Sequence, residues 1–456
     1  MYWVMAILPF VLLLLGFPIF LLLLATSLVI LLFFFDLPMA VVHQDIFNSL
    51  NKYALLAVPF FVFAGDLMSR GGISKRLLRW VASMIGGFRA HIPMTSLGFA
   101  ALFGAISGVT TAATAAIGTL TYPRMREAGY SERFASALIT AEGALDNLIP
   151  PSIAMIIYGI ASDTSVIQLF AAGIGPGLLL AGMFGVYIYY HSWRAGIMES
   201  GKFSFKEFLL ATRDGVWAIG AIAIIFGGIY SGVFSPTEAA GVACIYAIIV
   251  SYFVYRETTL REIFETAARS MYLTGLIFII VSVAGLYAWL LTISGIAEST
   301  VSLITNLHSE RWVVLLVINV FLLFVGCFLD PASALIMLTP LLAPVAASLG
   351  IDPIHFGVIV VMNLTIGTFH PPFGLNIFVC QALFKTPSQT LYIGLIPFVA
   401  IAILALMLVT YIPAISLWIM HLLAWAADIT ARLKSRSCRN ACRFADKGRR
   451  PWPRKN

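Results

Sequence analysis

Residues 142–152 have the sequence EGALDNLIPPS, from Glu142 to Ser152, and lie within an otherwise apolar segment. The adjacent prolines Pro150 and Pro151 remove two backbone donors, so an α-helix cannot continue through them in the ordinary way. At membrane depth, non-helical backbone is tolerated only where protein or water satisfies its polar groups. The stretch therefore predicts a transmembrane helix that is broken near its middle, with backbone carbonyls freed at the break.

The composition of the chain indicates a membrane protein. Of its 456 residues, 60% are hydrophobic and 11% are charged, whereas about a quarter of the residues of a soluble globular chain are charged. The net charge of +7 is concentrated at one end, because residues 432–456 hold ten Lys/Arg and one acid, which leaves 18 bases and 20 acids elsewhere. These values exclude an ordinary soluble enzyme, a nucleic-acid reader and a disordered chain. They indicate a near-neutral body with many spans, followed by a basic tail that we expect to be disordered.

The pattern around the break recurs 221 residues later. Residues 363–374 have the sequence NLTIGTFHPPFG, and the same offset aligns Pro123 with Pro344, Gly129 with Gly350, Pro150 with Pro371 and Pro151 with Pro372. Under this offset the stretches 92–123 and 311–349 also align, and each consists of two half-length apolar arms joined by small or polar residues, as in a re-entrant hairpin. Chance matching of Gly and Pro is the alternative, but it leaves unexplained why hairpins and broken helices align together.

The fold class that follows is an all-α polytopic membrane protein. It has two inverted structural repeats, each with a re-entrant helical hairpin and a discontinuous transmembrane helix. The predicted parts are a first repeat 1–190 (hairpin 92–123, broken helix 131–160), a cytoplasmic linker 191–213, a second repeat 214–412 (hairpin 311–349, broken helix 353–380), an interfacial helix 413–431 and the tail 432–456. Segment 72–88 is expected to be an amphipathic arm helix at the membrane surface.

The positions of the bases support the inverted arrangement. If the N-terminus lies outside, the predicted cytoplasmic segments hold 16 of the 18 bases of the body, and only Lys52 and Arg311 remain outside. An excess of Lys and Arg marks the cytoplasmic side, and inverted repeats with broken helices at the midplane are typical of secondary transporters. In this orientation the last crossing ends outside, so the basic tail stays unexplained.

Two candidate sites for a cation and a substrate follow from the hairpin tips and the breaks. Freed carbonyls and hydroxyls suit a hard cation such as Na⁺, and helix N-termini favour a carboxylate. The first site is predicted to comprise Ser107, Gly108, Thr110, Thr111, Gly143, Asp146, Asn147, Pro150 and Pro151. The second is predicted to comprise Asp330, Ser333, Asn363, Thr365, Gly367, Thr368, Pro371 and Pro372. The alternative is that the small residues only allow close helix packing.

A few charged or titratable residues lie within the apolar segments. Glu142, Asp146 and Asp330 are functional candidates, because a carboxylate inside a membrane is costly. Glu238 follows a Ser-Pro-Thr sequence and is expected to begin a helix. His370 could carry a proton, although we favour a packed, hydrogen-bonded histidine. The sequence has no Walker A, GxSxG or HExxH motif, so neither an ATP-driven pump nor these hydrolases are expected.

As a set, these motifs resemble the large membrane subunit of tripartite ATP-independent periplasmic (TRAP) transporters, the DctM-like family. The resemblance runs in order from about residue 5 to 425. The segments that carry it are 64–65, 104–108, 129–130, 148–152, 158–159, 169–177, 235–240, 350–353, 355–357 and 371–376. It implies an elevator-type Na⁺ symporter of the bacterial inner membrane, with no enzyme activity, no cofactor and Na⁺ as the coupling ion.

The resemblance also implies partners and site roles. The partners are a small four-helix membrane subunit (DctQ-like), a periplasmic substrate-binding protein (DctP-like) and an organic acid such as a C4-dicarboxylate or sialic acid, with no nucleic acid. The roles carry over to Ser107, Gly108, Gly143, Pro150, Pro151, Gly367, Thr368, Pro371 and Pro372. The chain departs from the family at Val109, where a Ser is usual, and at Asp146, where a Gly is usual.

Other function classes remain as alternatives. A stand-alone Na⁺/divalent-anion symporter shares the inverted hairpin plan, and a neighbouring gene for a small four-span subunit would argue against it. A channel or a non-transporting membrane scaffold is less favoured, because a channel needs no inverted pair of dead-end hairpins. The sequence leaves the substrate open, since selectivity is expected to lie largely in the separate binding protein.

Overall fold

The computed structural model describes residues 1–35, 39–197, 201, 203–296, 299, 301–302, 310–420 and 422, and all regular elements within them are helices. Seven of the described helices are long and apolar enough to cross a membrane, or eight if one bent pair counts as a span. In chain order the elements are α1 (Tyr2–Leu14), α2 (Ile19–Phe34), α3 (Met39–Leu50), η1 (Tyr53–Leu56), α4 (Ala57–Arg70), α5 (Ile73–Ile85), α6 (His91–Ser107), α7 (Thr110–Glu127), α8 (Glu132–Glu142), α9 (Leu145–Leu148), α10 (Ile153–Ala161), α11 (Val166–Arg194), α12 (Phe205–Tyr230), α13 (Pro236–Ile248), the π-helix η2 (Ile249–Val254), α14 (Leu260–Ile293), α16 (Arg311–Gly326), α17 (Pro331–Ser348), α18 (Pro353–Gly367), α19 (Leu375–Phe384) and α20 (Ser388–Tyr411).

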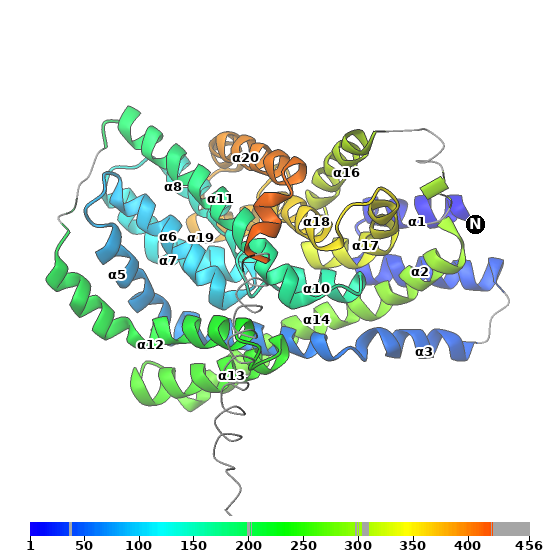
Figure 1. Cartoon of the computed structure of the whole chain (residues 1–456), viewed down its shortest axis with the longest axis horizontal. Coiled ribbons are helices and arrows are strands. Elements are labelled where there is room, and N and C mark those ends of the chain that lie inside the picture. Colours follow the sequence, from blue (N-terminus) through cyan, green and yellow to red (C-terminus); the bar gives the residue numbers. More distant parts are fainter. Residues whose placement is uncertain are drawn as a thin grey trace, which may run out of the picture.

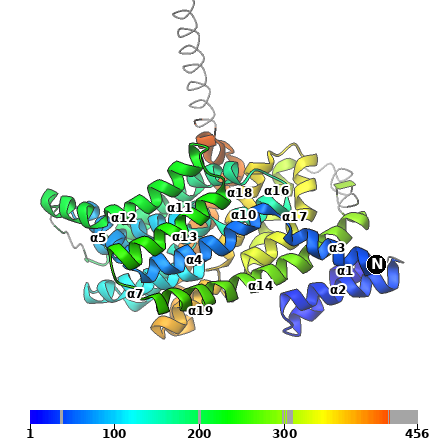
Figure 2. The same ribbon diagram turned by 90° about the horizontal axis from the view of Figure 1, so that it is seen from below.

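The repeat predicted from the sequence is visible in the helix bounds. The second arm of the first hairpin is α7, Thr110–Glu127, and that of the second hairpin is α17, Pro331–Ser348, so both ends are shifted by 221 residues. The packing is reciprocal: α10 contacts α17 while α19 contacts α7, and α11 contacts α18 while α20 contacts α8. Figures 1 and 2 show the two hairpins toward opposite ends of the long axis. Two repeats related by a pseudo-two-fold axis produce reciprocal contacts of this kind.

Both breaks occur where the paired prolines predict them. In the first half, α8 ends at Glu142, α9 ends at Leu148 and α10 begins at Ile153. The segment Glu132–Leu148 is bent by 45° relative to Ile153–Ala161. The hydroxyl of Ser152 accepts a hydrogen bond from the Met155 amide at 3.3 Å and so caps α10. In the second half, α18 ends at Gly367 and α19 starts eight residues later. Both Pro-Pro peptide bonds are cis.

Several helices extend into the cytoplasmic segments that we expected between the spans. Within the predicted linker 191–213, α11 continues to Arg194 and α12 begins at Phe205, where Ser204 caps its first turn. Segment 256–269, one of the segments placed on the cytoplasmic side by its bases, is helical from residue 260, because Thr259 and Glu262 form a capping box that starts α14. The expected helix start at Glu238 is confirmed by a second capping box, with Ser235. Of the predicted interfacial helix, 414–420 is helical; residues 421, 423–431 and the basic tail lie outside the described residues.

The predicted amphipathic arm is α5, which precedes the first hairpin. It buries Leu77, Leu78 and Val81 against its neighbours and presents its arginines to α12 and to the turn before α14. The contact with α6 is tight, because a Cβ on Gly98 would lie 3.0 Å from Val81 and 3.1 Å from Ile85. The arm therefore packs on the hairpin with one face and on the long helices with the other.

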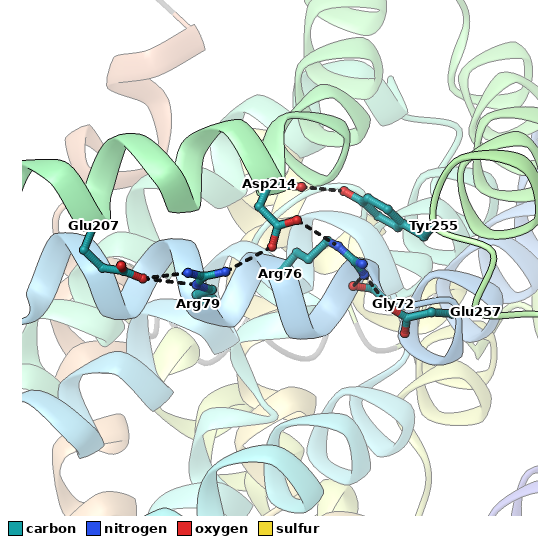
Figure 3. Close-up of polar contacts among 7 residues, drawn as sticks. All are labelled: Gly72, Arg76, Arg79, Glu207, Asp214, Tyr255 and Glu257. Carbon is teal, nitrogen blue, oxygen red and sulfur yellow. Dashed lines mark hydrogen bonds and ion pairs between the residues drawn. The ribbon is translucent and has the colours of Figure 1, made fainter.

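Two arginines tie α5 to the long helices (Figure 3). Arg79 donates to Glu207 at 2.9 Å and lies 3.4 Å from Asp214, both on α12. Arg76 donates to Glu257 at 2.6 Å, and its Nε lies 3.5 Å from the same Asp214. The hydrogen bond to Glu207 holds the pKa of the Arg79 guanidinium above its ordinary value. Exposed ion pairs are individually weak, but sharing Asp214 joins them into one network that fixes the arm.

Candidate functional site

The tip of the first hairpin touches the first break through its backbone. Gly108 ends α6 in a left-handed conformation with φ +68°, and a Cβ at this position would lie 3.1 Å from the Pro151 carbonyl oxygen. On the other side, a Cβ on Gly65 of α4 would lie 2.8 Å from the Ser107 Cα. The tip therefore lies between α4 and the break, and Ser107, Gly108 and Pro151 are close together there.

Asp146 brings a carboxylate to this tip. It lies on α9 and is 1% exposed. Its carboxylate faces the Ser107 hydroxyl and the Gly108 amide, yet neither oxygen makes a hydrogen bond of ordinary geometry with any described residue. Gly104 of α6 allows the approach, because its Cβ would lie 2.9 Å from the Asp146 Cα. A buried charge with only weak contacts to its neighbours is costly, so a site with one negative charge and with hydroxyl and carbonyl oxygens nearby fits a hard cation such as Na⁺.

The remaining residues of the first site lie on α7 and around Gly143. Thr110 begins α7 and is buried, and Thr111 is half-buried beside it. A Cβ on Gly143 would lie 1.9 Å from the Thr114 hydroxyl and 3.0 Å from the Asn376 amide nitrogen, so only glycine fits there. Predicted site members Asn147 and Pro150 are also buried in the break.

Asn376 comes from the second repeat, and our sequence prediction did not include it. Its Nδ2 donates to the Thr140 carbonyl at 3.4 Å and to the Thr368 hydroxyl at 3.3 Å, while its Oδ1 is buried without a partner in the described chain. It thereby links the two breaks. The 221 offset pairs Asn376 with Met155, which is apolar, so the repeat gave no signal for a polar residue at this position.

The second break is packed against its own hairpin in a similar way. A Cβ on Gly367 would lie 2.4 Å from the carbonyl carbon and oxygen of Gly326 on α16. Thr368 donates to the Thr365 carbonyl at 2.7 Å and accepts from Asn376. The Thr365 hydroxyl is buried, and no described residue hydrogen-bonds to it. The structure therefore brings Thr365, Gly367 and Thr368 together, with backbone and hydroxyl oxygens but no carboxylate.

Three further predicted residues of the second site have local partners. Asp330 is the N-cap of α17 and accepts from the amide of Ser333, at 3.1 Å, and from its hydroxyl. Asn363 donates to the Asn319 side chain at 2.6 Å, and Asn319 in turn donates to Thr410 at 3.0 Å. These contacts begin α17 and join α16, α18 and α20. The structure gives Asp330 and Ser333 a capping role and Asn363 a bridging role.

The second Pro-Pro break is also held by side chains that are outside the two predicted sites. His370 Nδ1 lies 3.1 Å from the Cys327 Sγ and 2.5 Å from the Pro371 carbonyl oxygen. The Tyr392 hydroxyl donates to the Pro372 carbonyl at 2.9 Å. His370 is therefore a hydrogen-bonded residue, in agreement with the interpretation we favoured over a proton carrier.

Comparison with known proteins finds relatives over most of the chain. Residues 6–415 match the family model described as "Tripartite ATP-independent periplasmic transporter, DctM component". The chain is 35% identical to the C4-dicarboxylate TRAP transporter large permease protein of Rhodobacter capsulatus, over 90% of this chain and 97% of that relative. It is 37% identical to the ectoine/5-hydroxyectoine TRAP transporter large permease protein of Ruegeria pomeroyi, with the same two coverages of 90% and 97%.

A solved structure shares the fold. The YdaH transporter of Alcanivorax borkumensis superposes with a TM-score of 0.64 over 91% of this chain and 98% of that one. The two sequences are 16% identical, so this likeness concerns the fold alone.

Proposed function

The chain belongs to the DctM family, the large membrane subunits of TRAP transporters, and on this premise we propose that it carries out Na⁺-coupled uptake of an organic acid. It is a multi-span helical protein of the bacterial inner membrane and not an enzyme. A small membrane subunit and a periplasmic binding protein complete the proposed assembly. Family membership weakens the alternatives of a stand-alone divalent-anion symporter, a channel and a scaffold.

The observation that carries the Na⁺ proposal is the carboxylate of Asp146. It is buried at the hairpin tip and faces the Ser107 hydroxyl and the Gly108 amide. No described residue makes a hydrogen bond of ordinary geometry with either of its oxygens. A bound cation would compensate this charge, and the hydroxyls and carbonyls of the tip and the break would supply further oxygens. Ser107, Gly108, Gly143 and Asp146 form the core of the proposed first site.

The substrate proposal depends on the helix starts around the breaks. After the first break α10 begins at Ile153, and after the second α19 begins at Leu375. Helix N-termini carry partial positive charge and unpaired amides, which favour a carboxylate. An organic acid held between the two breaks would therefore complement the cation at Asp146. Relatives are named for C4-dicarboxylates and for ectoine, so the family accommodates more than one carboxylate.

We infer that one group of helices, the transport domain, moves against a second group, the scaffold. The two groups are defined by which helices pack together. Hairpins α6–α7 and α16–α17 and the broken helices pack on one another across the repeats and form the proposed transport domain. Helices α2, α3, α4, α12, α13 and α14 form the proposed scaffold, to which the ion pairs of Arg76 and Arg79 fix α5. The boundaries at 190 and 214 divide the two repeats, and each repeat contributes to both domains.

The proposed function is tested by reconstitution with omission of single components. The permease and the small subunit encoded with it are placed in proteoliposomes, and the binding protein is loaded in turn with labelled succinate, sialic acid and ectoine. We expect uptake of one of these only when an inward Na⁺ gradient and the binding protein are both present. Undiminished uptake with K⁺ in place of Na⁺, or without the binding protein, would contradict the proposal.

A further inference from the structure

A second acid lies four residues before Asp146, and the proposed sites do not use it. Glu142 ends α8 and is 0% exposed. Its Oε2 lies 2.6 Å from the Ser96 hydroxyl on α6, and its Oε1 is buried without a hydrogen-bond partner in the described part of the chain. One hydroxyl contact is a small compensation for a buried carboxyl group, so this position needs an explanation beyond packing.

A line of hydroxyls on α7 runs past this acid from the hairpin tip. Thr110, Thr114 and Thr121 are spaced by four and seven residues, which places them on one face of the helix, and all three are buried. Thr114 lies against Gly143 at the break. Thr121 lies 3.1 Å from the Ser96 hydroxyl, which also contacts Glu142. The polar face of α7 thus connects the tip with Glu142.

Thr121, the last of these hydroxyls, also lines a cavity beside α5. The cavity has a volume of about 390 Å³ and is lined by residues that include His91, Thr95, Thr121, Arg124 and Glu127. Thr121 therefore lies both in the cavity wall and beside Ser96, two contacts from Glu142. Thr95, the neighbour of Ser96, has a buried hydroxyl for which the described residues offer no partner.

We propose that Glu142, with the hydroxyls of Ser96 and Thr121, is an additional binding station for the monovalent coupling cation, between the hairpin-tip site at Asp146 and the cavity beside α5. The station combines one carboxylate with hydroxyl oxygens, the ligand type that hard cations take. The cavity lining includes Arg124 and residues of segments 70–91 and 124–133. These two segments together hold eight bases, and such an excess marks the cytoplasmic side. The station therefore lies on the path by which the cation leaves toward the cytoplasm. This inference rests on the proposed Na⁺ coupling.

The test is the equilibrium binding of ²²Na⁺ to the purified full-length permease. Glu142→Gln keeps the shape of the side chain and removes its charge, and we expect one component of the binding curve to weaken by about tenfold or more. Ser96→Ala leaves the carboxylate in place and removes its hydroxyl partner, so we expect a smaller weakening of the same component. Glu310→Gln is the matched control, because Glu310 is an exposed acid before α16 and does not line the cavity, and its binding curve should equal that of the wild type.

The outcomes separate this inference from the proposed function. Unchanged ²²Na⁺ binding by folded Glu142→Gln, or by folded Ser96→Ala if the first variant does not fold, would overturn the station while Na⁺-driven uptake by the wild type stands. A change limited to the pH dependence of uptake, with the binding curve unmoved, would also overturn it. Failure of the proposed function would appear differently, as a wild-type permease that binds no ²²Na⁺ and takes up substrate without it.

Discussion

Replacing Gly367 with alanine is expected to separate the second hairpin from its broken helix. A Cβ at this position would lie 2.4 Å from the carbonyl carbon and oxygen of Gly326 and 2.6 Å from its Cα. All three are backbone atoms of α16, so no rotation of a side chain relieves the contact. The substitution therefore tests whether this backbone contact forms the second site.

The size of the effect follows from the displacement. Ordinary contact begins at 3.4 Å, so α16 and α18 must move apart by about 1 Å, the difference between 3.4 and 2.4 Å. Overpacking of this kind costs about 1–3 kcal/mol, and a 1 Å misplacement at a reacting site costs about 100-fold in rate. By the same geometric argument, we expect Gly367→Ala to fold with lower thermal stability and to take up substrate at about one hundredth of the wild-type rate.

The assay combines uptake by proteoliposomes with the unfolding temperature of the purified protein. Gly275→Ala on α14 is the matched control, because its Cβ would meet no described atom within 4 Å and alanine favours a helix interior by about 0.5–1 kcal/mol. Uptake by Gly367→Ala within twofold of the wild type, with an unchanged unfolding temperature, would refute the reasoning.

Three further predictions concern the first site, the arm and a helix start. Asp146→Asn removes the charge at the tip, so the Na⁺ concentration for half-maximal uptake should rise by about tenfold or more; the same value as for the exposed control Asp163→Asn would leave Asp146 a structural residue. Arg76→Ala removes the ion pairs with Asp214 and Glu257 and should lower the free energy of unfolding by about 1–2 kcal/mol. Arg261→Ala, whose pair with Glu265 is exposed, should lower it by less than about 0.5 kcal/mol, and equal losses would contradict a bracing role. Ser235→Ala removes the capping box of α13 and should cost about 1 kcal/mol in denaturant unfolding; no loss would show that the cap is dispensable.

The breaks and hairpins could be predicted because their causes lie in the local sequence. Two adjacent prolines stop a helix wherever they occur, and the repeat at 221 residues carries the same signal twice. The early start of α14 was not predicted, because 256–269 holds three bases, which indicate only the side of the membrane on which it lies. In the structure, the Thr259–Glu262 capping box and the Arg261–Glu265 pair stabilise a helix there.

The membership of the sites could be predicted less well, because it depends on contacts between distant segments. Asn376 reaches the first break from the other repeat, which no local pattern indicates. Asp330 was selected because it is an acid in an apolar segment, yet the sequence Asp-Pro-Ala-Ser also fits an N-cap with proline at the first helical position, and this is its role in the structure. Gly104 and Gly326 have no functional groups in a side chain. They allow two backbones to approach closely, and this role is visible only in the structure.

The most direct test of the central claim is the flux of ²²Na⁺ that accompanies substrate uptake into proteoliposomes holding the permease, the small subunit and the loaded binding protein. We predict that each substrate molecule taken up brings in at least one ²²Na⁺ ion, and that Asp146→Asn lowers both fluxes together. Uptake of substrate with no accompanying ²²Na⁺, at full rate and with the binding protein present, would contradict Na⁺ coupling through the hairpin-tip site.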